Sequence, residues 1–316
     1  MLSALAADFC RISGVSTDVL VDVRHRGLDL PGCTIHTVDS ASAERQTIAR
    51  LAAVADWTVV VAPEFDDHLL SRCLAVERAG GRLLSPNSRL VALAADKQAT
   101  AEQLSARGVP VAAGIALAAG KNFPVDFHYP AVLKPRFGAG SQGIRWISDA
   151  HAIDGAVSIA SRLERYVPGT AVSVAALCGP PAGEFSGIAP LVPCRQFVDR
   201  SADFAYSGGS LPIEPELAQR ATRLATRAIA TLADPLGYLG VDLVLGEDAS
   251  GADDAVIEIN PRLTTSYVGL RALARGNLAE AMMEVAAGRR VELCWHPGSI
   301  QFQSSGGVQW VELSSL

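Results

Sequence analysis

Residues 133–147 read LKPRFGAGSQGIRWI, and the interpretation of this stretch decides the fold. Its glycines Gly138, Gly140 and Gly143 have the G-x-G-x-x-G spacing of a dinucleotide-binding loop. The acid Glu164 follows roughly twenty residues later, where such a site has its ribose partner. A dinucleotide loop joins a strand to a helix, because the pyrophosphate lies at the helix N-terminus. The apolar and aromatic residues after Gly143 are typical of a strand, so we expect a hairpin loop instead.

The same loop has features that suit phosphate. Lys134 precedes it at the end of a predicted strand, and small residues such as Ser141 leave backbone N–H groups free. Backbone amides and an ammonium group together suit phosphate oxygens. The alternative is a glycine-rich hairpin turn without a ligand. No Gly-Lys-Ser/Thr sequence follows, so a Walker-type loop is not indicated.

The bulk composition is that of an ordinary globular protein. The chain has 316 residues, of which 49% are hydrophobic and 19% charged, enough for about two domains. A net charge of −6 without a basic block disfavours a nucleic-acid partner. The 6 cysteines include no C-x-x-C pair, which favours reduced thiols and a cytoplasmic location. No uncharged run reaches the ~20 residues of a membrane helix, so we expect no membrane partner.

The pattern of hydrophobic residues changes near residue 95. Before it, strand and helix patterns alternate, which predicts a small parallel sheet covered by helices on both faces. The predicted strands there are 18–23, 33–38 and 57–63, and the predicted helices are 2–12, 42–55 and 66–81. After a helix over 96–110, strands dominate, with one long helix at 214–233 and helical stretches near 266–287. The fold class is therefore α/β followed by α+β.

VIEINPR, residues 256–262, is the strongest chemical signal. Glu258 and Asn260 lie two apart on a predicted strand, so their side chains share one face. Asp242 lies on the preceding predicted strand. Two carboxylates and an amide oxygen suit Mg²⁺, although a solvated sheet face is the alternative. Arg262 follows and could stabilise charge on a transferred phosphoryl group, or form a surface ion pair.

These motifs together resemble the ATP-grasp superfamily over nearly the whole chain. In family order they are DK (96–97), the glycine-rich loop, ERYVPG (164–169), GVDLV (240–244) and EINPR (258–262). The resemblance implies an ATP-grasp fold with an N-terminal pre-ATP-grasp parallel-sheet domain. We expect the pre-ATP-grasp domain at 1–95, the small lobe with its flap at 96–168, and the large lobe with metal and substrate sites at 169–316. Against that family the first strand is missing, or the true start lies upstream.

The resemblance also implies roles for individual residues. The phosphates of ATP would meet Lys97, Lys134 and the loop 138–143. The hinge that contacts adenine would be Glu164, Arg165, Tyr166 and Val167. Two Mg²⁺ ions, for which Mn²⁺ could substitute, would be held by Asp242, Glu258 and Asn260. Arg262 and Lys134 would be catalytic, with Arg262 facing the transferred phosphate. One departure is that Thr170, Ala171 and Val172 occupy the place where family members carry a ribose-contacting acid.

A narrower resemblance comes from EINPRLTTSYVGLR (258–271), YSGGSLPI (206–213) and CRQFVD (194–199). These stretches look like the tyramine–glutamate ligases of methanofuran biosynthesis and their bacterial relatives in C1-carrier coenzyme pathways. The alternative is that they are general features of small ATP-grasp amino-acid ligases. Either way, the resemblance implies a cytoplasmic, ATP-dependent ligase that joins a small carboxylic acid to an amine. A kinase or a nucleotide-binding module that does not ligate is the other open class.

Substrate carboxylates need fixed cations, for which Arg195, Arg262 and Arg271 are the candidates. Arg271 lies on a predicted helix whose N-terminal amides could also receive an anion. Its alternative is a solvent-facing charge. Tyr206 and Gly208 belong to a predicted substrate loop, for which a simple hairpin turn is the alternative. A homodimer is the expected assembly.

Overall fold

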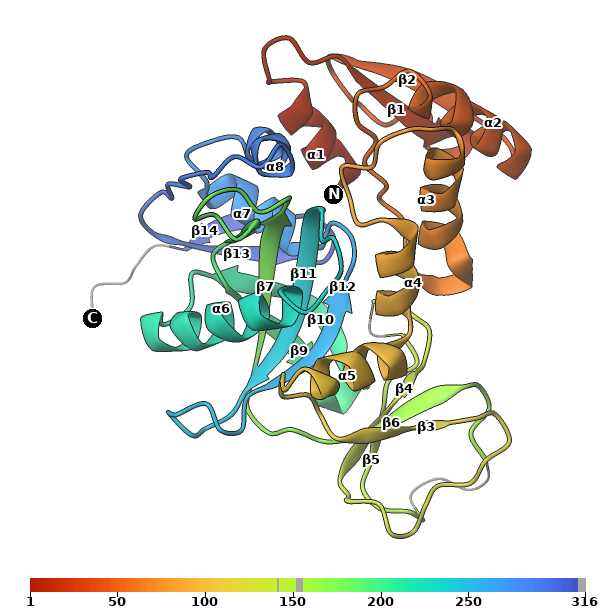
Figure 1. Cartoon of the computed structure of the whole chain (residues 1–316). Coiled ribbons are helices and arrows are strands. Elements are labelled where there is room, and N and C mark those ends of the chain that lie inside the picture. The colour runs from red at the N-terminus through yellow and green to blue at the C-terminus, as the bar shows by residue number, and fades with distance from the viewer. Residues whose placement is uncertain (141, 152–155, 312–316) are drawn as a thin grey trace.

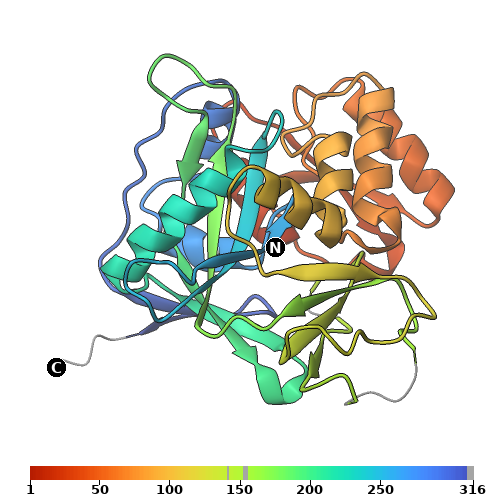
Figure 2. The same cartoon turned by 60° about the horizontal axis from the view of Figure 1, so that its bottom comes forward.

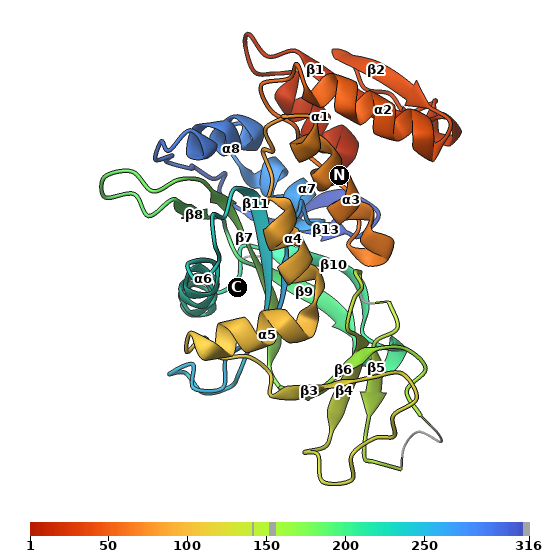
Figure 3. The same ribbon diagram turned by 45° about the vertical axis from the view of Figure 1, so that its right-hand side comes forward.

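The computed structural model of the protein describes residues 1–140, 142–151 and 156–311. Figure 1 and Figure 3 place the N-terminal two-stranded sheet and the strands β3 to β6 at opposite ends of the molecule. A large sheet lies between them, and α4 and α5 run along it beside its strand β12. The order of α/β elements followed by α+β elements confirms the predicted fold class.

The N-terminal part builds a small parallel sheet with helices. Its elements are α1 (Leu2–Phe9), β1 (Thr17–Asp22), the 3-10 helix η1 (Val23–His25), β2 (Cys33–Val38), α2 (Ala41–Ala52), the 3-10 helix η2 (Phe65–Asp67), α3 (His68–Arg78) and α4 (Ser88–Ala95). The strands β1 and β2 pair in parallel. Helix α2 begins after Ser40, whose hydroxyl accepts a hydrogen bond from the N–H of Ala43, as expected of an N-cap.

The predicted strand 57–63 is not a regular strand. Only Thr58 forms a bridge, through hydrogen bonds with the backbones of Arg82 and Leu84. The segment is nevertheless part of the core, where Val60 packs among buried residues of α3. Val60 is buried and the rest of the run is half-buried. In the described structure β1 and β2 pair only with each other, so the run does not extend their sheet. Helix α4 was missed, although Asn87 caps it by accepting from the N–H of Leu90.

Helix α5 (Lys97–Ala106) leads into a four-stranded antiparallel sheet with the order β3-β6-β4-β5. Its strands are β3 (Gly114–Leu117), β4 (Ala131–Pro135), β5 (Arg145–Ile147) and β6 (Ser161–Arg165). The glycine-rich loop connects β4 to β5, which pair antiparallel. The expected hairpin is therefore confirmed, and no helix follows the glycines. Figure 2 shows this lobe at the lower right, beside the large sheet.

The large sheet has eight strands in the order β12-β11-β7-β9-β10-β13-β14, with β8 on the side of β7. Its strands are β7 (Thr170–Cys178), β8 (Ile188–Pro190), β9 (Cys194–Asp199), β10 (Ala205–Leu211), β11 (Gly237–Leu245), β12 (Ala255–Asn260), β13 (Ser299–Gln303) and β14 (Val308–Val311). The connecting helices are η3 (Arg200–Ala202), α6 (Pro215–Ile229), α7 (Ser266–Leu273) and α8 (Leu278–Ala286).

The two faces of this sheet differ, and the difference positions the site. On β7, Val172 and Val174 belong to the core that packs against α6. The alternate residues Ala175 and Leu177 belong to the core under α7 and α8. Ser173 shares this second face because strand side chains alternate. This second face of the sheet is thus apolar where it packs under α7 and α8 and polar towards Ser173. Within the described residues, no helix has the length and apolar character to cross a membrane.

Candidate active site

Antiparallel pairing of β11 and β12 brings the predicted metal ligands together. Asp242 lies directly opposite Glu258, and Gly240 lies opposite Asn260. Directly opposed residues project from the same face, so all three polar side chains share one side of the sheet. The amide nitrogen of Asn260 donates a hydrogen bond to Asp242 Oδ2 at 2.9 Å. The predicted convergence of three oxygen-bearing side chains is therefore present.

The electrostatics of this group suit a divalent cation. Burial, and after it the neighbouring charge of Glu258, raise the pKa of Asp242 to about 6. A hard cation between the two carboxylates would relieve both costs. Among the described residues, no group of three or more His, Cys, Asp or Glu side chains is arranged to hold a metal ion. Two carboxylates and one amide instead fit Mg²⁺, which keeps several waters and uses substrate phosphates as ligands.

A β-bulge separates the paired acids from the rest of the ladder. The register shifts between Asp242 and Leu243, so Ile257 has no directly opposed residue on β11. A bulge leaves one residue outside the regular hydrogen-bond pattern. The carbonyl of Ile257 accepts a hydrogen bond from Lys134 Nζ at 3.2 Å. The bulge thus links the acidic strand to the lysine of β4.

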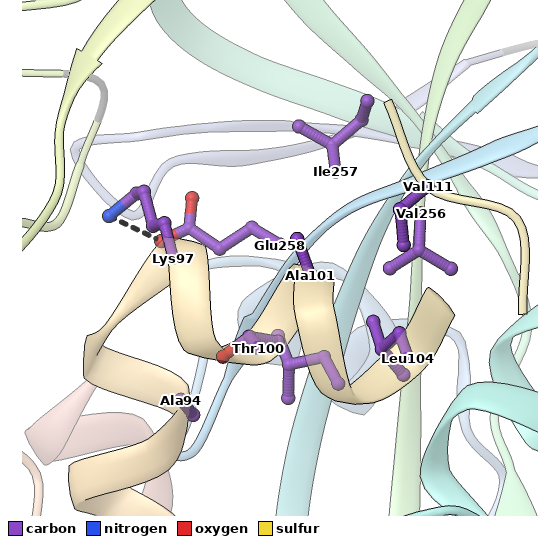
Figure 4. A pocket seen from close by; sticks show the side chains of 10 residues that line it. Ala94, Lys97, Thr100, Ala101, Leu104, Val111, Val256, Ile257 and Glu258 are labelled. Atoms are coloured by element: carbon purple, nitrogen blue, oxygen red, sulfur yellow. Dashed lines mark ion pairs between the residues drawn. The ribbon is translucent and has the colours of Figure 1, made fainter. Parts of the chain in front are cut away.

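Two buried lysines lie next to the acidic strand. Lys97, the first residue of α5, has its Nζ 3.1 Å from Glu258 Oε1 and donates to the carbonyl of Gly138 at 2.6 Å. Figure 4 shows Lys97 and Glu258 pointing toward one another from α5 and β12. Lys134 Nζ lies 2.7 Å from Glu164 Oε1. Both predicted phosphate-contacting lysines are therefore adjacent to the predicted metal ligands or to the hinge.

The hinge residues differ in what their groups contact. The Glu164 side chain is buried and also binds Arg162, whose Nε lies 3.0 Å from Oε2. The N–H groups of Arg165 and Tyr166 donate to the backbone carbonyls of Ala113 and Pro130. Within the described residues the N–H of Val167 makes no hydrogen bond. It is therefore the hinge N–H without a protein acceptor, and its contact with adenine stays a prediction.

The glycine-rich loop needs glycine at two positions. Gly140 and Gly143 have φ values of +70° and +68°, in the left-handed region that L side chains rarely adopt. The carbonyl of Gly138 is the acceptor of the Lys97 ammonium group. The predicted contact Ser141 lies outside the described residues. The loop therefore starts in contact with one of the two buried lysines.

Arg262 contacts an acid from the N-terminal part of the chain. Its Nε lies 2.8 Å from Glu64 Oε2, and its Nη1 donates to the carbonyl of Leu263 at 3.2 Å. Glu64 was not predicted as a site residue. It directly follows the apolar run 57–63, and an acid after such a run was the available signal.

Gln196 is a second site residue that sequence reasoning missed. Its amide nitrogen donates to Asp242 Oδ1 at 2.9 Å. Tyr206 lies in the same neighbourhood, where burial and then the charges of Cys194 and Asp242 raise the pKa of its hydroxyl group. Alternation of side chains on β9 puts Gln196 and Arg195 on opposite faces, but only the pairing of β9 with β7 shows that Gln196 faces Asp242.

The prediction for Arg195 needs correction. Arg195 is paired in register with Val172, whose side chain packs toward α6. Its Nη2 lies 2.9 Å from both carboxylate oxygens of Glu214, the residue before α6. Arg195 therefore lies on the face of the sheet opposite to Asp242, because strand side chains alternate.

Arg271 pairs with an acid of the first helix. Its Nε and Nη2 lie 2.9 Å and 2.7 Å from the two oxygens of Asp8, a residue that is 1% exposed. Asp8 also accepts from the hydroxyl of Tyr267 at 2.6 Å. These contacts tie α7 to α1. The guanidinium predicted to bind substrate is thus engaged in a bidentate ion pair, and its substrate role stays a prediction.

The predicted loop at 206–209 is part of strand β10. A register shift between Tyr206 and Gly208 marks a bulge against β9. A Cβ atom on Gly208 would lie 2.0 Å from the carbonyl oxygen of Phe302 on β13. The close approach of β13 therefore explains this glycine, and the expectation of a loop was wrong.

Comparisons with known proteins agree with this architecture. A family described as "ATP-grasp domain" matches residues 94–266, and a "pre ATP-grasp 3 domain" matches residues 15–91. A tyramine–L-glutamate ligase from Methanocaldococcus jannaschii is 26% identical over 231 residues, which are 73% of this chain and 63% of that protein. The one from Methanocaldococcus fervens is 29% identical over 124 residues, covering 39% of this chain and 37% of that protein. The chain thus spans less than two thirds of either relative.

Solved structures share the fold. A putative ATP-grasp superfamily protein from Archaeoglobus fulgidus has a TM-score of 0.62 at 24% identity, covering 85% of this chain and 75% of that one. Biotin carboxylase from Campylobacter jejuni has a TM-score of 0.74 at 16% identity, covering 95% and 72%. N5-carboxyaminoimidazole ribonucleotide synthetase from Thermotoga maritima has a TM-score of 0.71 at 18% identity, covering 95% and 77%. With its domain match spanning more than half of its length, this chain belongs to the ATP-grasp family.

Proposed function

We propose that the chain is an ATP-dependent carboxylate–amine ligase that releases ADP and phosphate. The observation that carries the proposal is the shared face of Asp242, Glu258 and Asn260, with two buried lysines beside it. Phosphoryl transfer requires carboxylate oxygens that hold a divalent ion and cations that bind phosphate oxygens. Both kinds of group occur together at this place. Arg262 adds a third cation, held near this group by Glu64.

The chemistry follows from the poor leaving group of a carboxylate. Attack of an amine on a carboxylate would have to expel oxide, which does not occur at neutral pH. Transfer of the γ-phosphoryl group of ATP to the carboxylate oxygen gives an acyl phosphate and ADP. The amine then attacks the acyl carbon, the C–O bond to phosphate breaks, and the amine loses a proton. An amide and inorganic phosphate are the products.

The residues of this chain supply charge and position rather than covalent chemistry. Lys97 and Lys134 would bind phosphate oxygens, and Arg262 would face the transferred group. Asp242, Glu258 and Asn260 would hold Mg²⁺, or Mn²⁺ in its place, which neutralises phosphate charge when bound. We propose two ions, as the resemblance to the ATP-grasp superfamily implies.

The glycine-rich loop is proposed to exclude water. An acyl phosphate hydrolyses readily, so the site must be closed while the intermediate exists. The loop begins at the Lys97 ammonium through the Gly138 carbonyl. If the phosphates of ATP took the place of the Gly138 carbonyl at Lys97, the backbone N–H groups of the loop could bind them, and the loop would close over the phosphates.

The substrates are proposed from the relatives. An amino acid such as glutamate would supply the carboxylate and a primary amine such as tyramine would attack it, in a coenzyme pathway of the methanofuran or tetrahydromethanopterin type. Gln196 extends the polar face beyond Asp242 and is available to contact the acid. With small molecules as its partners, the enzyme is further proposed to act as a homodimer in the cytoplasm.

ADP release tests the proposal. With MgATP, L-glutamate and tyramine, release should require both the acid and the amine and should match amide formation. Hydroxylamine in place of the amine should trap the acyl phosphate as a hydroxamate. ADP release with the acid alone, and an acyl phosphate as final product, would identify a kinase instead. Nucleotide binding without turnover over a panel of amino acids and amines would indicate a binding module.

A further inference from the structure

Glu64 is an acid of the N-terminal part that reaches the proposed reaction centre. Its side chain is 3% exposed, and its Oε2 accepts from Arg262 Nε at 2.8 Å. The two residues are 198 positions apart in the chain. Among the described residues, this is the one ion pair between the chain before α4 and the segment that runs from β12 to Arg262. The contact therefore connects two regions that local sequence does not relate.

The three proposed phosphate-side cations each have an acidic partner. Lys97 pairs with Glu258 and Lys134 with Glu164, all within residues 96–262. Arg262 alone takes its partner from the N-terminal part. Both side chains of this ion pair are sheltered from solvent, with exposures of 14% for Arg262 and 3% for Glu64.

The geometry of the pair leaves one end of the guanidinium available. Arg262 is held through Nε by Glu64 and through Nη1 by the carbonyl of Leu263. Within the described residues Nη2 makes no hydrogen bond. A guanidinium is planar, so fixing two of its nitrogens fixes the direction of the third. The contacts through Nε and Nη1 hold the plane of the group and therefore orient the remaining donor, Nη2.

The segment around Glu64 is itself held in an unusual conformation. Asp66 and Asp67 follow it with φ values of +52° and +54°, in the left-handed region that non-glycine residues rarely adopt. The N–H of Leu69 donates to the carbonyl of Pro63 at 2.9 Å and closes the turn. Such conformations persist where the surrounding structure enforces them, often at functional sites. Glu64 thus projects from a tightly defined turn.

We propose that Glu64 is a positioning residue for catalysis: it fixes the Arg262 guanidinium so that Nη2 meets the transferred phosphoryl group. This inference rests on the proposed function. The N-terminal part is then a component of the reaction centre as well as a neighbouring domain. Burial raises the pKa of Glu64, and the charge of Arg262 opposes that shift. The pair is therefore strongest when the carboxylate is ionised, as a charge-assisted hydrogen bond requires.

The test uses Glu64→Gln, which keeps the shape of the side chain and removes its charge. The matched control is Glu44→Gln, because Glu44 also pairs with an arginine, Arg72, at 2.7 Å in the N-terminal part. We expect Glu64→Gln to lower kcat for ADP release about 10- to 100-fold, a typical cost of losing an orienting contact. The KM for ATP should change less than about threefold, and Glu44→Gln should leave kcat unchanged.

A double-mutant cycle with Arg262→Ala separates positioning from general stability. If Glu64 acts through Arg262, Glu64→Gln causes no further loss of kcat in the Arg262→Ala background. The inference would be overturned if the kcat of the double variant fell by the product of the two single losses. It would also be overturned if Glu44→Gln lowered kcat as much as Glu64→Gln. Should Glu64→Gln fail to fold, Glu64→Asp serves in the same cycle because it withdraws the carboxylate by one methylene.

A binding measurement distinguishes failure of the inference from failure of the proposed function. Aluminium fluoride with MgADP mimics a phosphoryl group in transfer. The wild-type chain should gain thermal stability with MgADP and gain more when aluminium fluoride is added. Glu64→Gln should keep the first gain and lose the second. Equal gains in both proteins would overturn the inference alone, whereas no gain with MgADP in the wild type would overturn the proposed function and the inference together.

Discussion

Arg195 and Gln196 are consecutive residues of β9, and their side chains lie on opposite faces of the large sheet. Gln196 donates to Asp242 on the polar face, whereas Arg195 pairs with Glu214 next to α6. The choice between them depends on a single step along a strand, because successive side chains alternate. A motif that contains both residues cannot say which one faces the site.

This difference predicts opposite outcomes for two alanine variants. Arg195→Ala should keep kcat/KM within about twofold and lower stability by at most ~1 kcal/mol, because the pair is exposed. Gln196→Ala should lower kcat about tenfold or raise the Mg²⁺ concentration needed for turnover, because Asp242 loses an orienting partner. ADP release measured across a Mg²⁺ titration compares them. A large loss for Arg195→Ala with none for Gln196→Ala would contradict the assigned faces.

Glu258→Gln should abolish turnover and leave nucleotide binding measurable. The substitution removes a carboxylate opposite Asp242 and leaves the strand pairing intact. ADP release reports turnover, and a fluorescent nucleotide analogue reports binding. Glu247→Gln is the control, because Glu247 is an exposed acid just beyond the end of β11. Retained turnover in Glu258→Gln would remove Glu258 from the proposed metal ligands.

Asp8→Ala should destabilise the protein without involving the nucleotide. Asp8 is buried and accepts from Arg271 and Tyr267, so its removal leaves buried polar groups unpaired. Breaking a buried pair in this way costs about 3–5 kcal/mol. Asp22→Ala, which breaks an exposed pair with Arg24, should lower stability far less. Urea denaturation compares the two variants, and similar costs would show that the Asp8 contacts are not stabilising.

Gly208→Ala should lower stability more than Gly183→Ala. Both glycines have positive φ, but the Cβ at position 208 would lie 2.0 Å from a backbone oxygen of β13. At position 183 nothing lies within 4 Å of the added atom. The second variant should cost about 1 kcal/mol from conformation alone, and the first should cost clearly more. Thermal denaturation of both proteins measures the difference, and equal shifts would argue against a close approach of β13.

The local sequence determined several elements of the fold and part of the candidate site. The spacing of Glu258 and Asn260 fixed their common face, because strand side chains repeat every second residue. The residues after Gly143 indicated a strand, which gave the hairpin and excluded a dinucleotide loop. Asp96 indicated the start of α5, where its carboxylate accepts from the N–H groups of Gln98 and Ala99. Each of these features depends on residues close together in the chain.

Only the tertiary structure decided which side chains the site contains beyond those motifs. The contact of Glu64 with Arg262 spans 198 residues, and the engagement of Arg271 by Asp8 spans 263. Gln196, and not Arg195, faces Asp242, because the register of β9 on β7 determines which face each residue occupies. Such contacts arise when distant segments pack to bury their apolar surfaces, and no periodicity in the chain encodes which pair will meet.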